Sequence, residues 1–196
     1  GGPVIPGYQG EDQSFEHLKK QADQIGYPLM VKAAAGGGGR GLRVVYEEGQ
    51  FQSALESAQR EGLNSFGSSQ VFLEKYLNES KHIEVQIFAD AKGDVFHLYD
   101  RECSVQRRHQ KVIEEAVTAT LDENTRQEIC NTAVKIAKQA GYKGAGTVEF
   151  LYEKGEFFFL EMNTRLQVEH PVTELVLGVD LVKAQILTAQ NKSVTW

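Results

Sequence analysis

The chain has 196 residues, of which 41% are apolar and 24% charged, and its formal net charge is -6. This is the composition of an ordinary globular protein, and the acidic balance argues against a general nucleic-acid binder, whose affinity depends on a basic surface. Two cysteines and the lack of an apolar run of membrane length exclude a disulfide framework and a spanning segment. We therefore expect a cytoplasmic protein, or a mitochondrial matrix protein in a eukaryote, with no nucleic-acid or membrane partner.

The first part of the chain reads as a small lobe that mixes helices and strands, because apolar residues recur there at helical and at strand spacing. The expected elements are an extended segment over 1–10, a helix over 15–25 capped by Ser14 and ended by Gly26, strands over 29–33 and 42–46, a helix over 50–61 and a strand over 71–77. The chain that leaves the last strand is suited to act as a hinge and to pair with an adenine edge.

A glycine run, Gly36-Gly-Gly-Gly-Arg-Gly41, lies between two of these strands, whereas a Walker loop leads from a strand into a helix. Glycines let the backbone turn several N–H groups toward one point, which makes an anion site suited to nucleotide phosphates. Lys32, on the preceding strand, is placed to contact the same phosphates as a point charge. The alternative is an exposed hairpin without a ligand, but the neighbouring Arg40 and Arg43 favour phosphate binding.

The second part of the chain reads as a larger lobe built on strands. The expected elements are strands over 82–89, 95–101, 146–152 and 157–161, a helix over 122–140, a short helix from Pro171 to Gly178, and a last helix from Asp180 to about Gln190. His82, Glu84 and Gln86 share one strand face, which is either solvated or the wall of a cleft, and spacing does not decide between them. The basic run from Arg101 to Lys111 is either a surface patch or a site for a small anion.

Two acidic residues, Glu149 and Glu161, lie on strands that a turn at Gly155 joins into a hairpin. A three-residue loop centred on Gly155 would set these carboxylates directly opposite each other, which is destabilising without a cation between them. Mg²⁺ takes such oxygen ligands while it holds nucleotide phosphates, and Asn163 and Arg165 lie on the same side as Glu161. The alternative is a solvated face with salt bridges, and a one-residue slip in register would separate the acids.

Taken together, these segments resemble the ATP-grasp superfamily and, within it, biotin carboxylase. The resemblance runs from about Tyr8 to the C-terminus and is carried by Met30–Ala33 with the glycine run, Glu74–Leu77, Ser104–Lys111 leading to Glu114 and Glu115, Gly144–Glu149, and Glu161–Pro171. It implies an α+β ATP-grasp fold in which two α+β lobes with antiparallel sheets grip ATP between them. Residues 1–76 would form the small lid lobe with the glycine-rich hairpin, and residues 77–196 the large lobe with the metal and bicarbonate site.

The resemblance also implies the activity of an ATP-dependent carbon–nitrogen ligase. Bicarbonate attacks the γ-phosphate of ATP in the presence of Mg²⁺ or Mn²⁺, and the carboxyphosphate formed passes CO₂ to biotin on a carboxyl carrier domain, which then serves a carboxyltransferase subunit. The implied ATP contacts are Lys32, Gly36, Gly37, Gly38, Gly39, Glu74, Lys75, Leu77, His82, Gln106 and His109. The implied metal ligands are Glu149, Glu161 and Asn163. The implied bicarbonate contacts are Lys111, Arg165, Gln167 and Val168, with Glu169 as the base.

The full enzyme of this family has an N-terminal nucleotide-fold domain and a C-terminal domain that these 196 residues do not include. We therefore expect an excised core that is inactive alone and binds nucleotide weakly, taken from an oligomeric enzyme. Ala116–Thr120 stands where the family usually has prolines, so the path of that loop stays open. Two alternatives are another ATP-grasp ligase, of the carbamoyl-phosphate synthetase type, and a non-catalytic nucleotide-binding module. The segment Arg165–His170 favours biotin carboxylase, and the presence of every metal ligand and of the base argues against the module.

Overall fold

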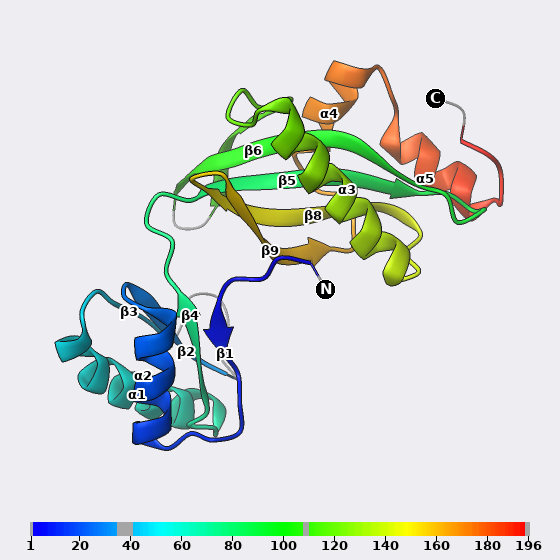
Figure 1. The fold of residues 1–196 in the computed structure, drawn as a ribbon. Coiled ribbons are helices and arrows are strands. Elements are labelled where there is room, and N and C mark those ends of the chain that lie inside the picture. The colour runs from blue at the N-terminus through cyan, green and yellow to red at the C-terminus, as the bar shows by residue number, and fades with distance from the viewer. Residues whose placement is uncertain (1, 35–40, 108–109, 195–196) are drawn as a thin grey trace. The chain divides into compact units, whose positions relative to one another are not determined.

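The structure is a computed structural model that describes residues 2–34, 41–107 and 110–194. The glycines Gly36 to Gly39 and His109, which the sequence analysis assigns to ATP, lie outside the described residues. The chain divides into two compact units (Figure 1), one of them Ile5–Glu79 and the other Gly1–Val4 together with Ser80–Trp196. The sequence analysis places this division after residue 76.

The smaller unit, Ile5–Glu79, is a four-stranded antiparallel sheet in the order β1-β4-β2-β3 with two helices. Its elements are β1 (Gly7–Tyr8), α1 (Phe15–Ile25), β2 (Leu29–Ala33), β3 (Leu42–Val45), the 3-10 turn η1 (Glu48–Gln50), α2 (Phe51–Phe66) and β4 (Val71–Lys75). Burial alternates along β2, so one face of the sheet packs against the helices. Leu18 of α1, Leu55 of α2, Val31 and Leu73 belong to this single core.

Two details of this unit differ from the expectation. Ser14 occupies the N-cap position of α1, but its hydroxyl donates to Asp12 Oδ1 (2.7 Å) and makes no cap hydrogen bond. Helix α2 does not end at Glu61, because Gly62 is a packing residue: a Cβ added there would lie 2.6 Å from the carbonyl oxygen of Ser68. The helix ends instead at Gly67, whose φ of 74° is left-handed.

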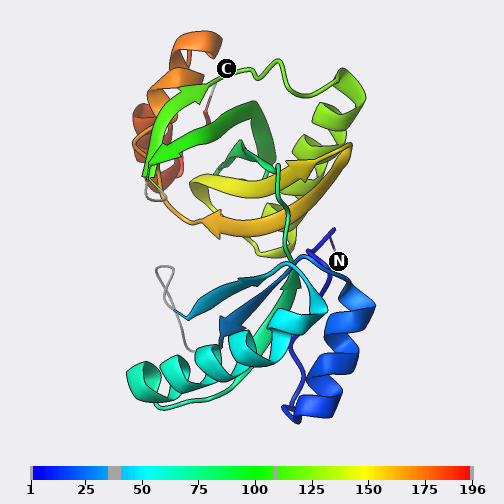
Figure 2. The ribbon, with the colours of Figure 1, turned by 90° about the vertical axis from the view of Figure 1, so that its left-hand side faces the viewer.

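The larger unit is a five-stranded antiparallel sheet in the order β7-β6-β5-β8-β9. Its elements are β5 (Lys81–Ala89), β6 (Val95–Arg107), β7 (Gln110–Glu115), α3 (Glu123–Gln139), β8 (Gly144–Glu153), β9 (Glu156–Asn163), α4 (His170–Leu177) and α5 (Leu181–Ala189). Helix α3 covers one face, where Ile129 and Ala133 pack against Ile83 and Val85. Helices α4 and α5 lie on the opposite side of this sheet (Figure 2), and Leu181 packs there.

The hairpin of β8 and β9 has the predicted pairing but not the predicted loop. Glu149 is opposite Glu161, as expected, yet Glu153 pairs with Glu156, so the loop consists of Lys154 and Gly155 alone. Both loop residues have positive φ, 52° and 89°, as a tight hairpin turn requires. A register shift next to Glu149 adds one residue to β9 and restores the pairing of the two acids.

A second strand region is also longer than predicted. Strand β6 continues to Arg107, and Gln110–Glu115 forms the edge strand β7, so the described part of the basic run belongs to the sheet rather than to a loop. Polar composition hides such an edge strand from a pattern search, since edges are often charged. Among the described residues, no helix has the length and apolarity needed to cross a membrane.

Candidate active site

The face of the large sheet that lies opposite α3 carries rows of polar side chains. Residues directly opposite each other in antiparallel strands share a face. One row across β6, β5, β8 and β9 consists of Arg101, Glu84, Glu149 and Glu161. The next row consists of Gln86, Thr147 and Asn163. The polar face of β5 is therefore buried in the protein rather than solvated, since Glu84 and Gln86 are both 0% exposed.

Lys111 of β7 is the cation at the centre of this face. Its ammonium contacts Glu84, lies 3.0 Å from Glu149 Oε1 and lies 2.7 Å from Glu169 Oε1. Burial alone would favour the neutral amine, but the charges and hydrogen bonds of these carboxylates raise the pKa of Lys111 above its ordinary value. Lys111 is therefore fully protonated at neutral pH.

The carboxylate of Glu149 has hydrogen-bond partners on several different elements. Its Oε1 accepts from Asn163 Nδ2 at 2.8 Å and from Gln167 Nε2 at 2.9 Å, and its Oε2 lies 2.7 Å from His82 Nε2. Burial opposes the charged form, but the hydrogen bond from His82 and the charge and hydrogen bond of Lys111 lower the pKa of Glu149 to about 2. This carboxylate, only 4% exposed, stays ionised at any physiological pH.

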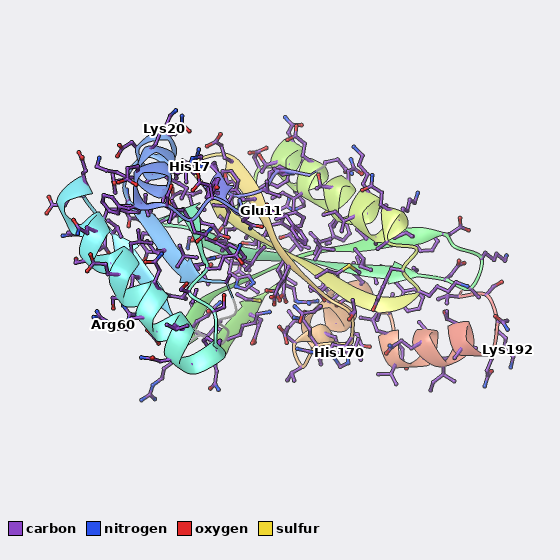
Figure 3. All side chains as sticks on the ribbon, turned by 90° about the horizontal axis from the view of Figure 1, so that it is seen from below. Glu11, His17, Lys20, Arg60, His170 and Lys192 are labelled. Carbon is purple, nitrogen blue, oxygen red and sulfur yellow. The ribbon has the colours of Figure 1, made fainter. Side chains whose placement is uncertain are left out.

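Glu169 stands immediately before α4, whose first residue, His170, is labelled in Figure 3. Burial would raise the pKa of Glu169, but the hydrogen bond from Lys111 and the charges of Lys111 and Arg101 hold it below its usual value. An ionised carboxylate beside an ammonium group is able to accept a proton from a small acid that the same ammonium binds.

A cavity of about 880 Å³ opens over these groups, entirely within the larger unit. It is lined by His82, Gln106, Gln110, Lys111, Glu114, Glu149, Leu151, Leu160, Glu161, Asn163, Arg165, Gln167, Val168 and Glu169. All the residues predicted to bind metal or bicarbonate thus line one cavity, together with His82 and Gln106. Gln106 Nε2 lies 2.9 Å from His82 Nδ1, and Val168 is 91% exposed.

The other described residues predicted to bind ATP belong to the smaller unit. Lys32 and Glu74 lie on neighbouring strands and form an ion pair. The ammonium of Lys75 donates to the carbonyl oxygens of Gly26 and Tyr27, at 3.2 and 3.1 Å. Leu77 follows β4 and is partly buried.

The donor set fits a hard divalent cation. In the part of the chain that the structure describes, five carboxylates line or underlie the cavity, against three cations, Lys111, Arg101 and Arg165, which leaves negative charge uncompensated; the carboxylates are those of Glu84, Glu114, Glu149, Glu161 and Glu169. Carboxylate and amide oxygens are the ligands that Mg²⁺ takes. The amide nitrogen of Asn163, not its oxygen, points at Glu149 and lies 3.5 Å from Glu161 Oε1. The side-chain amide must therefore rotate if Asn163 is to ligate a metal.

Sequence reasoning missed the residue beneath this cavity, Arg101, which it treats only as one member of a basic run. Arg101 is 0% exposed and ion-pairs with Glu84 at 2.6 Å. One signal in the sequence could have indicated it. Side chains alternate along β5, so Glu84 and Gln86 share one face, and a carboxylate on a buried face needs a cationic partner.

The two antiparallel α+β units and a cavity with acidic, amide and lysine side chains define an ATP-grasp protein. The chain belongs to the family described as the carbamoyl-phosphate synthase L chain ATP-binding domain, whose model matches residues 1–195. It is 52% identical over 194 residues to the alpha subunit of the mitochondrial methylcrotonoyl-CoA carboxylase of Dictyostelium discoideum, covering 98% of this chain and 28% of that protein. It is 53% identical over 192 residues to a pyruvate carboxylase subunit of Methanothermobacter thermautotrophicus, covering 98% and 39%.

Solved structures agree with these relatives. The complex of biotin carboxylase from Campylobacter jejuni with β,γ-ATP matches with a TM-score of 0.86 and 50% identity, over 99% of this chain and 44% of that one. The biotin carboxylase domain of 2-oxoglutarate carboxylase from Hydrogenobacter thermophilus, which holds MgADP and bicarbonate, matches with a TM-score of 0.84 and 46% identity, over 99% and 43%. The predicted α+β ATP-grasp fold and the resemblance to biotin carboxylase are confirmed. The chain spans less than half the length of these relatives.

Proposed function

We propose that this chain is the ATP-grasp core of a biotin carboxylase and that it activates bicarbonate with ATP for the carboxylation of carrier-bound biotin. The observation that carries the proposal is the convergence of Lys111, Gln167 and Glu169 beside Glu149 in one cavity. A cation, an amide donor and an ionised carboxylate that line the same cavity are what a small, acidic oxyanion requires. The Hydrogenobacter domain, similar over 99% of this chain, holds bicarbonate and MgADP.

In the proposed reaction, an oxygen of bicarbonate attacks the γ-phosphorus of ATP, the bond from that phosphorus to the bridging oxygen breaks, and ADP leaves with the electron pair. Lys111 and Gln167 hold the anion, with Arg165 and the backbone of Val168, while Glu169 accepts its proton. The carboxyphosphate then splits into phosphate and CO₂, and the ureido nitrogen of biotin attacks the CO₂ and gives its proton to the phosphate. The residues act mainly by positioning and by neutralising charge, as phosphoryl transfer requires.

The release of Lys111 from its carboxylates is part of this proposal. Lys111 is shared among Glu84, Glu149 and Glu169, and an arriving anion competes with those carboxylates for its N–H groups. When the Lys111 contact with Glu169 is given up to bicarbonate, Glu169 loses a hydrogen bond that stabilises its ionised form, and the pKa of that carboxylate rises. Binding of the substrate therefore makes Glu169 a stronger base.

Glu149, Glu161 and Asn163 are the proposed ligands of Mg²⁺ or Mn²⁺, and their oxygens suit either ion. The metal, when bound, neutralises charge on the phosphate oxygens of ATP. Lys32, Glu74, Lys75 and Leu77 of the smaller unit, with His82 and Gln106, are the proposed contacts of the nucleotide, and residues 1–76 the proposed lid. The proposed partners are a biotin carboxyl carrier domain and a carboxyltransferase subunit, in a larger and oligomeric enzyme that is located in the cytoplasm or mitochondrial matrix.

A second candidate is a ligase of the carbamoyl-phosphate synthetase type, because the matching family model bears that description. Such an enzyme would share the cavity chemistry but pass the carboxyphosphate to ammonia. The carboxylase relatives, at 50% identity or more, favour biotin as the acceptor. Stimulation of ATP cleavage by free biotin, and not by ammonium, supports the first candidate, and the reverse response supports the second.

An isotope experiment tests the central step in the intact protein that contains this chain. With ¹⁸O-labelled bicarbonate, attack by bicarbonate leaves one labelled oxygen on each phosphate released, because the carbon–oxygen bond breaks in the second step. Attack by water leaves none. The proposal expects labelled phosphate, and unlabelled phosphate from the wild-type protein would refute it.

A further inference from the structure

Arg101 has all of its hydrogen-bond donors occupied, each by a different residue. The side chain is 0% exposed and is the largest of the fully buried ones among the described residues. Its acceptors are Glu84 Oε1 (2.6 Å), Gln86 Oε1 (2.8 Å), Thr173 Oγ1 (2.9 Å), Gln167 Oε1 (3.2 Å) and Thr147 Oγ1 (3.5 Å). A guanidinium group has five N–H donors in a rigid planar fork. Because all five donors are occupied, the rigid guanidinium group of Arg101 fixes the positions of its five acceptors.

Two of these acceptors connect Arg101 to residues proposed to bind bicarbonate. Glu84 turns one oxygen to Arg101 and the other to Lys111, so the guanidinium helps to fix where the ammonium lies. Gln167 gives its carbonyl oxygen to Arg101 and its NH₂ group to Glu149. Because the guanidinium only donates, it determines which end of the Gln167 amide faces the cavity.

A third connection holds the base. Gln167 and Thr173 lie on either side of Glu169 in the chain, and both accept from Arg101. Thr173 is on α4 and is 2% exposed. Arg101 thus ties the segment that carries Gln167 and Glu169 to the sheet at two points. Its own side chain does not line the cavity.

A β-bulge brings Arg101 to this face. The pair Ile87↔His97 has a register that would set Asp100 opposite Glu84, but the register shifts before Val85↔Asp100, and Arg101 takes that place. The extra residue is accommodated at Tyr99, whose φ is +60°. A one-residue change of register moves side chains to the other face of a sheet, and bulges often re-aim side chains next to active sites.

We infer that Arg101 is a positioning residue for the bicarbonate site: it sets Lys111 through Glu84, orients the Gln167 amide, and anchors Glu169 through Gln167 and Thr173. The inference rests on the proposed function. A purely structural role is the alternative, since removal of one partner of a buried ion pair leaves an uncompensated buried charge and destabilises the protein. The two roles differ in what a substitution changes: positioning alters the use of bicarbonate, whereas a structural role alters stability alone.

The first test is steady-state kinetics of Arg101→Met and Arg101→Lys in the intact protein. A misplacement of about 1 Å at a reacting centre costs on the order of a hundred-fold in rate, so we expect Arg101→Met to lower kcat/KM for bicarbonate on that scale while the KM for ATP changes little. Arg101→Lys keeps the charge but not the planar fork and should recover only part of the loss.

Arg126→Met is the matched control. Arg126 is also an ion-paired arginine, bound to Asp100 at 2.9 Å and to the carbonyl oxygen of Thr118 at 2.6 Å, but it contacts no residue that lines the cavity. The Arg126→Met variant should lose stability and keep its kcat/KM for bicarbonate. An equal change of kcat/KM for bicarbonate in the Arg101 and Arg126 variants would overturn the inference.

Thr173 provides a milder test if the Arg101 variants fold poorly. Thr173→Val keeps the side-chain volume and removes the hydroxyl acceptor, whereas Thr173→Ser keeps the acceptor. We expect Thr173→Val to raise the KM for bicarbonate and Thr173→Ser to restore most of the affinity. Equal values for both variants would overturn the inference.

A crystal structure of Arg101→Met decides without any assay. The inference expects the Gln167 amide and the Lys111 ammonium to leave their contacts with Glu149, and it is wrong if both stay in place. Failure of the proposed function is distinguished from failure of this inference by a different experiment. It would show in the wild-type protein as release of unlabelled phosphate from labelled bicarbonate.

Discussion

Replacement of Glu149 by Gln removes one charge from the middle of the cavity while keeping the size of the side chain. Oε1 of Glu149 accepts from Asn163 and Gln167, and its Oε2 faces His82 Nε2. The tautomer of His82 that suits both of its neighbours accepts from Gln106 at Nδ1 and donates from Nε2. In Glu149→Gln, the new NH₂ group would therefore face a donor.

The magnitude follows from the pKa of Glu149, which falls from 4.5 to about 2 on folding. At about 1.4 kcal/mol per unit, this corresponds to roughly 3 kcal/mol of stabilisation at neutral pH. Because the folded-state pKa is the lower one, this contribution is present above about pH 4.5 and is lost as the pH falls toward 2. The wild-type protein should thus lose roughly 2 kcal/mol between pH 7 and pH 3 that Glu149→Gln does not lose.

Urea denaturation followed by circular dichroism at the two pH values measures this difference. The matched control is Glu102→Gln, because hydrogen bonds from Thr120 and Lys81 overcome the cost of burial and lower the pKa of Glu102 to about 2 outside the cavity. Both variants should lose pH-dependent stability, but only Glu149→Gln should also lose metal-dependent ATP cleavage, by more than about a hundred-fold. Equal pH dependence in wild type and Glu149→Gln, or normal ATP cleavage by that variant, would refute the reasoning.

Five further outcomes are expected. Lys111→Met should lower bicarbonate-dependent ATP cleavage by on the order of a hundred-fold, measured as ¹⁸O-labelled phosphate, and an unchanged rate would contradict its role. EDTA should stop ATP cleavage, and Glu161→Gln should raise the Mg²⁺ concentration for half-maximal rate by about ten-fold or more; an unaltered Mg²⁺ requirement would exclude Glu161 as a ligand. Tyr99→Val should destabilise by about 1 to 2 kcal/mol in a melting experiment, because β-branched residues resist positive φ, whereas Tyr99→Asn should not. Burial raises the pKa of both thiols, that of Cys130 to about 12, so neither Cys103 nor Cys130 should react with a thiol reagent at pH 8 before urea unfolds the protein.

Local patterns in the sequence were enough to locate most elements of the fold. Helix α1, strand β2 and helix α3 follow from apolar spacing and from the residues at their ends, such as Gly26 and Asp122. Residues of the candidate site were predictable where the chemistry lies in one segment, as in Glu161–Glu169. The partner of each such residue was harder to predict, because Lys111 reaches Glu169 from a strand that the pattern did not indicate.

Strand register was the part of the structure that local sequence patterns did not predict correctly. The predicted pairing of Glu149 with Glu161 is correct, but it was derived from a three-residue loop, and the loop has two residues. An extra residue in β9 compensates for the shorter loop and brings the two acids opposite each other. The same device in β6 moves Arg101 onto the polar face. Each bulge changes which side chains share a face without changing the composition of its strand, so no periodicity reports it. The polar face that these bulges assemble is stable only as a set, since Arg101 and Lys111 neutralise carboxylates that would otherwise repel one another across adjacent strands. A substitution that shifts either register would therefore remove several site residues at once, whereas a side-chain substitution removes one.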